Sequence, residues 1–442
     1  MHETTFNRRG FLQVAAMTVV SAQLGSVTVA GAQPASGAIR PFRVDVPEAQ
    51  LADLRARIKA TIWPERETVA DDSQGVPLAE MQELARHWAA DYDWRRCEAR
   101  LNALPQFMTE IDGLDVHFVH VRSKHENALP IVVTHGWPGS IIEQLKIVEP
   151  LTNPTAHGGS ASDAFHVVIP SIPNYGFSGK PATRWGPDRT ARAWTTLMKR
   201  LGYTRFVAQG GDVGSLITNV MALQAPPELL GIHTNFAFTV PVDVLKAIRS
   251  GNPPPAGFSA DEKRAYEQVM DLNANHFAYG AMQATRPQTL YALSDSPVGL
   301  ASWLLDHGDG SSQPAAVIMS AALGRTIEGH PADGLTRDDV LDNVTLYWLT
   351  NTGVSAARSY WENAVWGAKS GVSVLKAVDV TIPAAVSVFP GELYLPPRSW
   401  TERAYHKLIH YNRVAKGGHF AAWEQPQLFS EELRVSLRPL RT

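Results

Sequence analysis

An aspartate in a glycine-rich turn is the residue of this sequence with the clearest chemical potential. Asp212 stands in the stretch Gly210-Gly211-Asp212-Val213-Gly214-Ser215, shortly after the apolar run 206–208. A sharp turn from a strand into a helix requires small neighbours on both sides of a strained residue. A carboxylate at the tip of such a turn is anionic at neutral pH and can attack an electrophilic sp³ carbon, which leaves an alkyl ester on the protein. The alternative role for Asp212 is an N-cap of the following helix.

A histidine and a glutamate nearer to the C-terminus supply groups that would hydrolyse such an ester. His419 lies in the glycine-rich stretch 416–420, a suitable place for an accessible general base. Glu392 follows an apolar run that ends at Phe389 and would orient His419 and stabilise its imidazolium. Each residue alone is explained equally well as an ordinary loop side chain. The chain order of nucleophile, acid and histidine is the order in α/β-hydrolases, which predicts that the three act together.

A second glycine-rich turn precedes the aspartate in the chain. The stretch His135-Gly136-Trp137-Pro138-Gly139-Ser140 follows the apolar run 131–133. The backbone N–H groups of Trp137 and Val213 are predicted to form an oxyanion hole for the ester. An ordinary turn between a strand and a helix is the alternative. The sequence contains no Gly-x-Ser-x-Gly elbow, which disfavours a serine esterase.

The elements that must position these groups follow from the pattern of apolar residues. Strands are predicted at residues 116–121, 131–133, 165–170, 206–208, 385–389 and 408–411, and helices at residues 47–58, 79–92, 190–201 and 215–223. Short β-branched runs that alternate with helical segments indicate an α/β fold with a mostly parallel central sheet covered by helices. The stretch from about 236 to 348 lacks strand patterns and is predicted to be a helical lid inserted between two strands.

The chain is predicted to consist of five consecutive segments. They are an export signal, an N-terminal wrapping extension, the first part of the α/β core, the helical lid and the second part of the core, at residues 1–32, 33–106, 107–236, 237–348 and 349–442.

The first segment has the features of a twin-arginine export signal. Arg8 and Arg9 precede a weakly apolar stretch that ends at the small residues Ala30-Gly31-Ala32. The apolar stretch is short and diluted for a transmembrane helix, which is the alternative. The protein is therefore predicted to be exported to a periplasm or secreted, without a stable membrane anchor.

Together, the motifs resemble those of the microsomal-type epoxide hydrolase family, from about Pro41 to Arg438. Besides the turns described above, residues 172–178 (Ile-Pro-Asn-Tyr-Gly-Phe-Ser) and 294–300 (Ser-Asp-Ser-Pro-Val-Gly-Leu) are similar to family motifs. The N-terminal extension resembles the N-terminal domain of that family. Several independent matches in the right order make coincidence a poor explanation. The resemblance implies an α/β-hydrolase fold and the addition of water to an epoxide through an ester on Asp212.

The resemblance also implies two catalytic tyrosines in the lid. Tyr279 lies a few residues before the stretch 283–287 (Gln-Ala-Thr-Arg-Pro), and Tyr360 follows the stretch 347–350 (Tyr-Trp-Leu-Thr). Two phenol O–H groups can hold the oxygen of an opening epoxide and pass it a proton. Packing within the lid is the alternative role for each. Other lid aromatics suggest an apolar pocket: Phe277, Trp303 and Trp361.

Composition and charge narrow the cofactors and partners. The formal net charge of −3 supplies no basic field for a nucleic acid. The single cysteine, Cys97, excludes an internal disulfide and is predicted to be a buried filler. No His, Cys or carboxylate cluster in the sequence has metal-ligand spacing, and the predicted reaction requires no cofactor. The predicted partner is a small-molecule epoxide, and a homodimer stays open.

Two other functions are open at this point. A haloalkane or haloacid dehalogenase also uses an aspartate nucleophile, but its halide favours an N–H donor such as an indole directly after that residue. Here Val213 takes that position, although Trp137 could supply an indole. The second alternative is an inactive α/β-hydrolase that only binds a ligand. The complete set of nucleophile, acid and histidine argues against it.

Overall fold

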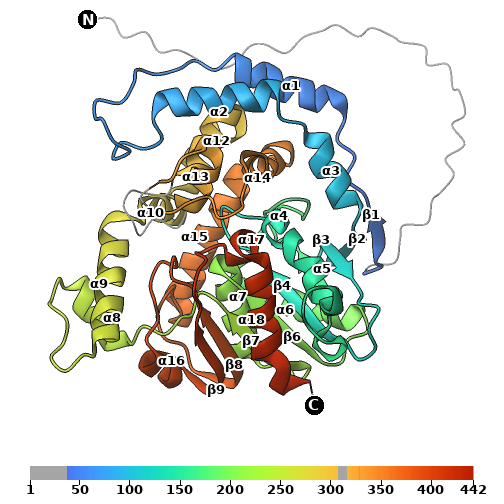
Figure 1. The fold of residues 1–442 in the computed structure, drawn as a ribbon, viewed down its shortest axis with the longest axis vertical. Helices are drawn as coiled ribbons and strands as arrows, with labels where there is room; N and C mark the ends of the chain where they lie inside the picture. Colours follow the sequence, from blue (N-terminus) through green and yellow to red (C-terminus); the bar gives the residue numbers. More distant parts are fainter. Residues whose placement is uncertain (1–36, 307–315, 328, 442) are drawn as a thin grey trace, which may run out of the picture. The chain divides into compact units, whose positions relative to one another are not determined.

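A nine-stranded sheet forms the centre of the fold (Figure 1), in a computed structural model that describes residues 37–306, 316–327 and 329–441. The strand order is β1-β2-β3-β5-β4-β6-β7-β8-β9. Their bounds are β1 Arg40–Phe42, β2 Gln106–Ile111, β3 Leu114–Val121, β4 Leu129–Thr134, β5 Phe165–Pro170, β6 Phe206–Gly210, β7 Leu229–Thr234, β8 Val380–Val388 and β9 Tyr405–Arg413. The pairs from β1 to β5 are antiparallel and those from β5 to β9 are parallel, so the predicted mostly parallel sheet is confirmed.

All six predicted strands are present, with bounds that differ by a few residues. The sequence reading missed β1, β2 and β7. β7 carries Gly231 and the buried His233 in its middle, which weakens the apolar signal that predicts a strand. The predicted export signal at residues 1–32 lies outside the described residues and stays a prediction.

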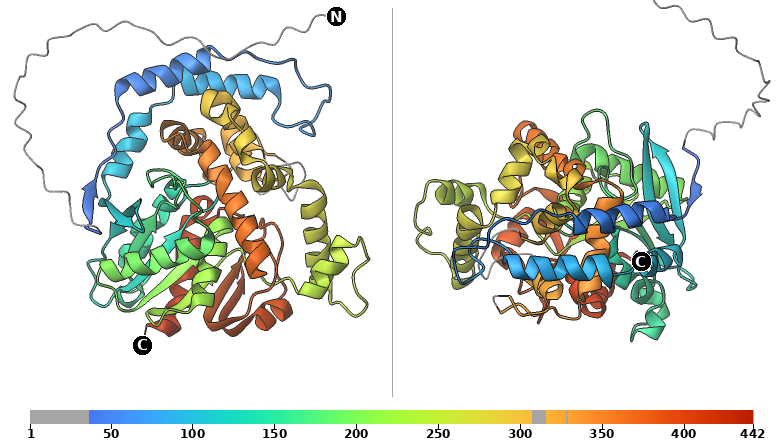
Figure 2. Two further views of the ribbon diagram at one scale, coloured as in Figure 1. Left: turned by 180° about the vertical axis from the view of Figure 1, so that it is seen from behind. Right: turned by 90° about the horizontal axis from the view of Figure 1, so that it is seen from above.

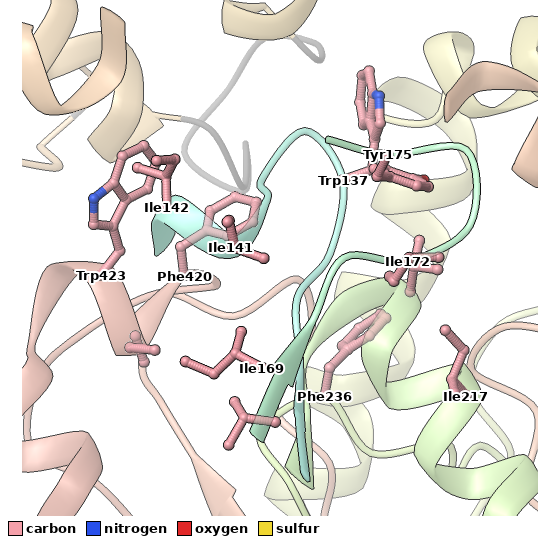
Figure 3. Packing of buried hydrophobic residues seen from close by; sticks show 14 of the residues in the cluster. Trp137, Ile141, Ile142, Ile169, Ile172, Tyr175, Ile217, Phe236, Phe420 and Trp423 are labelled. Atoms are coloured by element: carbon pink, nitrogen blue, oxygen red, sulfur yellow. The ribbon is translucent and has the colours of Figure 1, made fainter. Parts of the chain in front are cut away.

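Helices cover the sheet and connect its parallel strands. Their bounds are α4 Ile141–Gln144, α5 Val148–Thr152, α6 Pro187–Arg200, α7 Asp212–Gln224, α16 Arg398–Ala404, α17 Ala421–Glu424 and α18 Pro426–Leu437. The helices predicted at 190–201 and 215–223 are α6 and α7, and each begins three residues earlier than predicted. Buried side chains from several elements belong to the hydrophobic core, among them Ile169 of β5, Ile217 of α7 and Trp423 of α17 (Figure 3).

A run of helices lies between β7 and β8, and we call it the lid. Its members are α8 Val242–Arg249, α9 Ala260–Asn275, α10 Ala278–Thr285, α11 Ala292–Asp295, α12 Pro297–Leu305, α13 Ala316–Leu323, α14 Arg337–Leu349 and α15 Gly353–Ser370. The predicted boundary between lid and core, at Trp348, falls near the end of α14 and stays a prediction. In the structure one further helix, α15, follows it before β8 begins.

The N-terminal extension adds strands to the sheet and helices to the lid. Its helices are α1 Glu48–Lys59, α2 Leu78–Ala90 and α3 Trp94–Asn102. β1 pairs with β2 at the edge of the sheet, whereas α1 and α2 pack on the lid helices α12 and α13 (Figures 1 and 2). The indole of Trp88 donates to Thr345 Oγ1 at 2.9 Å, and Tyr92 donates to Asp342 Oδ1 at 2.7 Å. Arg325 of the lid pairs with carboxylates of the extension.

Two further observations bear on predictions from the sequence. Cys97 is fully buried in α3, as expected of a filler. Within the described residues, no helix has both the length and the apolar character that a membrane crossing requires.

Candidate active site

Asp212 occupies a strained position between β6 and α7. Its φ of 48° lies in the left-handed region, which few residues other than glycine adopt. The flanking glycines are sterically required, since a Cβ on Gly210 would lie 2.1 Å from the Gly214 carbonyl oxygen and one on Gly214 would lie 2.1 Å from the Thr134 carbonyl oxygen. The N-cap of α7 is Gly211, without a side-chain capping bond, so the alternative role for Asp212 is wrong.

Two backbone N–H groups hold the Asp212 carboxylate. Trp137 N–H donates to Asp212 Oδ1 at 2.8 Å, and the N–H of Val213 also hydrogen-bonds to the carboxylate. The turn that carries Trp137 passes so close that a Cβ on Gly136 would lie 2.5 Å from Asp212 Cβ. These are the two donors predicted for the oxyanion hole, and both contact the carboxylate whose oxygen would carry negative charge.

The other carboxylate oxygen faces the histidine. His419 Nε2 lies 3.4 Å from Asp212 Oδ2, and Nδ1 of the same ring lies in a short hydrogen bond with Glu392 Oε1. Glu392 also accepts from the N–H of Leu393 at 2.8 Å. A bridge between Gly391 and Gly418 joins the two loops and so fixes the acid beside the histidine. His419 and Glu392 are buried, whereas 14 % of the Asp212 side chain is exposed toward the cavity above it.

The charges in this triad shift the pKa values in a direction that suits the reaction. Burial disfavours the ionised form of Asp212, but His419 and the backbone donors outweigh burial, and the pKa of Asp212 is lowered. Burial also works against the imidazolium, yet Glu392 and Asp212 together raise the pKa of His419 well above its ordinary value. Burial raises the pKa of Glu392, and His419 opposes that shift. In the free protein, both shifts favour the ionised forms of Asp212 and His419.

Both predicted tyrosines line the same cavity as Asp212. This cavity has a volume of about 550 Å³ and lies beneath the lid. Tyr279 of α10 stacks on Trp137 with ring centroids 4.9 Å apart, and Tyr360 of α15 meets the same indole edge-on at 5.7 Å. Burial and the charge of Asp212 raise the pKa of Tyr279, and burial raises that of Tyr360. Both phenols are therefore protonated donors at neutral pH.

The predicted aromatic lining is partly wrong. Phe277 lines the cavity, but Trp303 and Trp361 do not, and 40 % of the Trp361 surface is exposed. Trp366, five residues after Trp361 in α15, lines the cavity instead. The helical phase of an aromatic residue cannot be assigned until the face that the helix presents to the core is known.

Glu143 is a buried residue at the site that the sequence reading missed. Its Oε1 accepts from the N–H of Gly136 at 3.2 Å, and a Cβ on Gly139 would lie 1.5 Å from its Oε2. Burial raises the pKa of Glu143 to about 8, with a contribution from the charge of Asp212. The carboxyl group therefore supports the turn that carries the Trp137 donor. A glutamate directly after the two isoleucines 141 and 142, four positions after Gly139, was the available signal.

The structure brings all seven predicted site residues together. Asp212, Glu392 and His419 form one hydrogen-bonded chain; Trp137 and Val213 hold the carboxylate; Tyr279 and Tyr360 face it across the cavity. In such a site the Asp212 carboxylate can accept an alkyl group from a substrate, while the tyrosines protonate the oxygen that leaves. It can then activate water beside the ester.

Comparison with known proteins gives consistent results. Residues 39–144 match the family model described as the epoxide hydrolase N terminus, and residues 130–258 match the α/β-hydrolase fold. The chain is 49% identical over 405 residues to a putative epoxide hydrolase of Stigmatella aurantiaca, which covers 91% of this chain and 86% of that protein. It is 34% identical to epoxide hydrolase 1 of Sus scrofa, with coverages of 91% and 90%.

Solved structures show the same similarity. Aspergillus niger epoxide hydrolase superposes with a TM-score of 0.74 at 29% identity, covering 92% of this chain and 98% of that chain. Juvenile hormone epoxide hydrolase of Bombyx mori superposes with a TM-score of 0.78 at 26% identity, with coverages of 92% and 95%. The predicted α/β-hydrolase fold and the resemblance drawn from the motifs are both confirmed.

Proposed function

Because this chain belongs to the epoxide hydrolase family, we propose that it converts an epoxide to a vicinal diol through a covalent ester on Asp212. The observation that carries the proposal is the placement of the Asp212 carboxylate. The carboxylate accepts from two backbone N–H groups, that of Trp137 at Oδ1, while its Oδ2 lies beside His419, and the group lines a cavity that both tyrosines also line. The dehalogenase alternative loses support, since the chain belongs to a different family and has Val213 directly after the nucleophile.

The first half of the reaction forms the ester. Asp212 Oδ2 attacks one epoxide carbon, the carbon–oxygen bond of the ring breaks, and the electron pair goes to the epoxide oxygen. Tyr279 and Tyr360 hold this oxygen, and one of them gives it a proton. Because both phenols have raised pKa values, the proton is available throughout the neutral range.

The second half hydrolyses the ester. Esterification removes the negative charge of Asp212, one of the two carboxylates that raise the pKa of His419. The pKa of His419 therefore falls when the ester forms, and the ring becomes a base at the stage that needs one. His419 takes a proton from water, and the water oxygen attacks the ester carbonyl carbon. The backbone donors hold the oxyanion until the bond between the acyl carbon and the diol oxygen breaks. His419 gives its proton to that leaving oxygen, and the second proton of the water passes from the restored carboxyl group to the tyrosinate, which leaves Asp212 as a carboxylate again.

Isotope labelling tests the covalent route. In a single turnover in ¹⁸O water with enzyme in excess, the diol is expected to contain no label, because its new oxygen comes from Asp212. Label then appears in the diol of later turnovers, after water oxygen has entered the carboxylate. Full labelling of the first diol would show direct attack by water. A parallel halide-release assay on haloalkanes is expected to give no product.

The tyrosines are predicted to act on the first half of the reaction. Tyr279→Phe/Tyr360→Phe is expected to lower the single-turnover rate of ester formation by about 10²–10⁴-fold, since both donors to the leaving oxygen are lost. Ester hydrolysis is expected to change much less. Tyr291→Phe is the matched control, because Tyr291 is a lid tyrosine that is 65% exposed and does not line the cavity. Equal slowing of both steps would contradict the assigned role.

A further inference from the structure

The cavity above Asp212 carries positive charge at its open end. Lys246 and Arg249 of α8 and Lys376, in the loop after α15, line it there. Lys246 and Arg249 are exposed and Lys376 is half-buried, so all three lie at the rim. Among the described residues, Asp212 at the base is the one carboxylate that lines the cavity. The rim is therefore electropositive and is not balanced by acids of the same cavity.

The helix α8 explains how cations and apolar side chains share one wall. Val242, Leu245, Lys246 and Arg249 are spaced by three and four residues and so lie on one face of α8, the face that lines the cavity. Leu245 is buried, whereas Lys246, the next residue, and Arg249, one turn further along the helix, are exposed. The face thus changes from apolar to basic toward the solvent.

The cations at the rim have no acidic partner among the residues that the structure describes. Neither Lys246 nor Arg249 forms an ion pair or a side-chain hydrogen bond with any residue that the structure describes. The ammonium group of Lys376 donates to the Gly371 carbonyl, which is uncharged. An anion at the rim would therefore meet cations that have no competing carboxylate partner.

Apolar side chains form much of the remaining cavity wall. The buried Leu216, Phe238, Leu272 and Leu393 and the half-buried Trp366 belong to it. The volume of about 550 Å³ is that of a pocket for a ligand of moderate size. One cavity thus combines a nucleophile with two proton donors, a buried apolar wall and an exposed basic rim.

We propose that the substrate is an epoxide on an apolar body that ends in a carboxylate, with the carboxylate at Lys246 and Arg249. The inference rests on the proposed function of Asp212 and adds the class of substrate. Burial of the apolar body would supply affinity, and the rim cations would fix the orientation that places the epoxide ring at Asp212.

The test compares two forms of one substrate. A medium-chain terminal epoxide that ends in a carboxylate and its methyl ester are assayed with wild-type enzyme, Lys246→Gln/Arg249→Gln and Lys246→Glu/Arg249→Glu. The control Lys263→Gln/Arg264→Gln removes the same charge from exposed positions of α9 that do not line the cavity. Aryl epoxide turnover by each variant reports whether the catalytic groups are intact.

Wild-type enzyme is expected to prefer the carboxylate, through a lower KM. The glutamine variant should lose about tenfold in kcat/KM for the carboxylate and change little for the ester, and the glutamate variant should prefer the ester. The carboxylate preference should also weaken as salt concentration rises. Equal use of both forms by wild type, with the aryl epoxide still hydrolysed, would overturn the substrate class alone. Failure of wild type on every epoxide would overturn the proposed function as well.

Discussion

Asp212→Asn is expected to lower kcat for epoxide hydrolysis by a factor on the order of 10⁴ or more, because the amide cannot form the ester. The substitution isolates chemistry from folding. Residue 212 has a φ of 48°, a conformation that asparagine adopts at low cost, and the amide oxygen can still accept from the N–H of Trp137. Initial rates under saturating substrate measure the loss, and the thermal midpoint is expected to stay close to that of the wild type.

One control is specific to this substitution. An amide beside His419 is itself exposed to activated water and can be hydrolysed to aspartate, which would restore activity with time. Mass spectrometry of the peptide that contains residue 212 therefore accompanies each assay. Full activity in a sample whose asparagine is intact would show that water is added without the Asp212 ester.

His419→Gln is expected to stop the reaction after its first half. The variant keeps the nucleophile, the backbone donors and both tyrosines, but it lacks the base that activates water. One equivalent of epoxide should be consumed, and the peptide that holds Asp212 should gain the mass of the substrate. Steady-state turnover should fall by about 10²–10⁴-fold or more. An unmodified peptide after incubation with a substrate that the wild type hydrolyses would contradict this role.

In the wild-type enzyme, lowering the pH also tests whether His419 acts as the base in ester hydrolysis, because protonation removes that base. Ester hydrolysis requires neutral His419 and therefore slows as the pH falls through the pKa of that ring in the ester. Ester formation requires ionised Asp212, whose pKa is lowered, and so continues further into the acid range. The fraction of enzyme trapped as ester is thus expected to increase toward acid pH. In His419→Gln the residual hydrolysis should lose this dependence.

Much of the fold could be predicted because the core elements are locally consistent. The runs that became β5 and β6 are apolar and bounded by turn residues, and that pattern predicts each of them as a strand of a mostly parallel sheet. β1 was not predictable in this way, since its three residues form a strand only by pairing with β2 at the sheet edge. Pairing with a strand that is distant in the chain therefore determines that β1 forms.

The site was predictable to the extent that it depends on turns. Glycines that flank Asp212 and His419 report backbone geometry directly, so their roles could be read from the sequence. The position of Tyr360 came from family resemblance, because a tyrosine in a helix gives no sign of the cavity that it will line. Glu143 was missed for a related reason. Its carboxyl group reaches the Trp137 turn only when α4 folds back beneath that turn.

The contacts between the lid and the N-terminal extension have a consequence for substrate entry and product release. Trp88 and Tyr92 donate hydrogen bonds to α14, and Arg325 forms ion pairs with two carboxylates of the extension. These interactions restrict the motion of this side of the lid. We expect exchange where exposed residues line the cavity, at α8 and residues 371–376. The epoxide would then enter, and the diol would leave, through the same opening of the cavity. Narrowing it with a larger residue at Val242 or Val374 would slow both, and slow departure would appear as inhibition by accumulated diol.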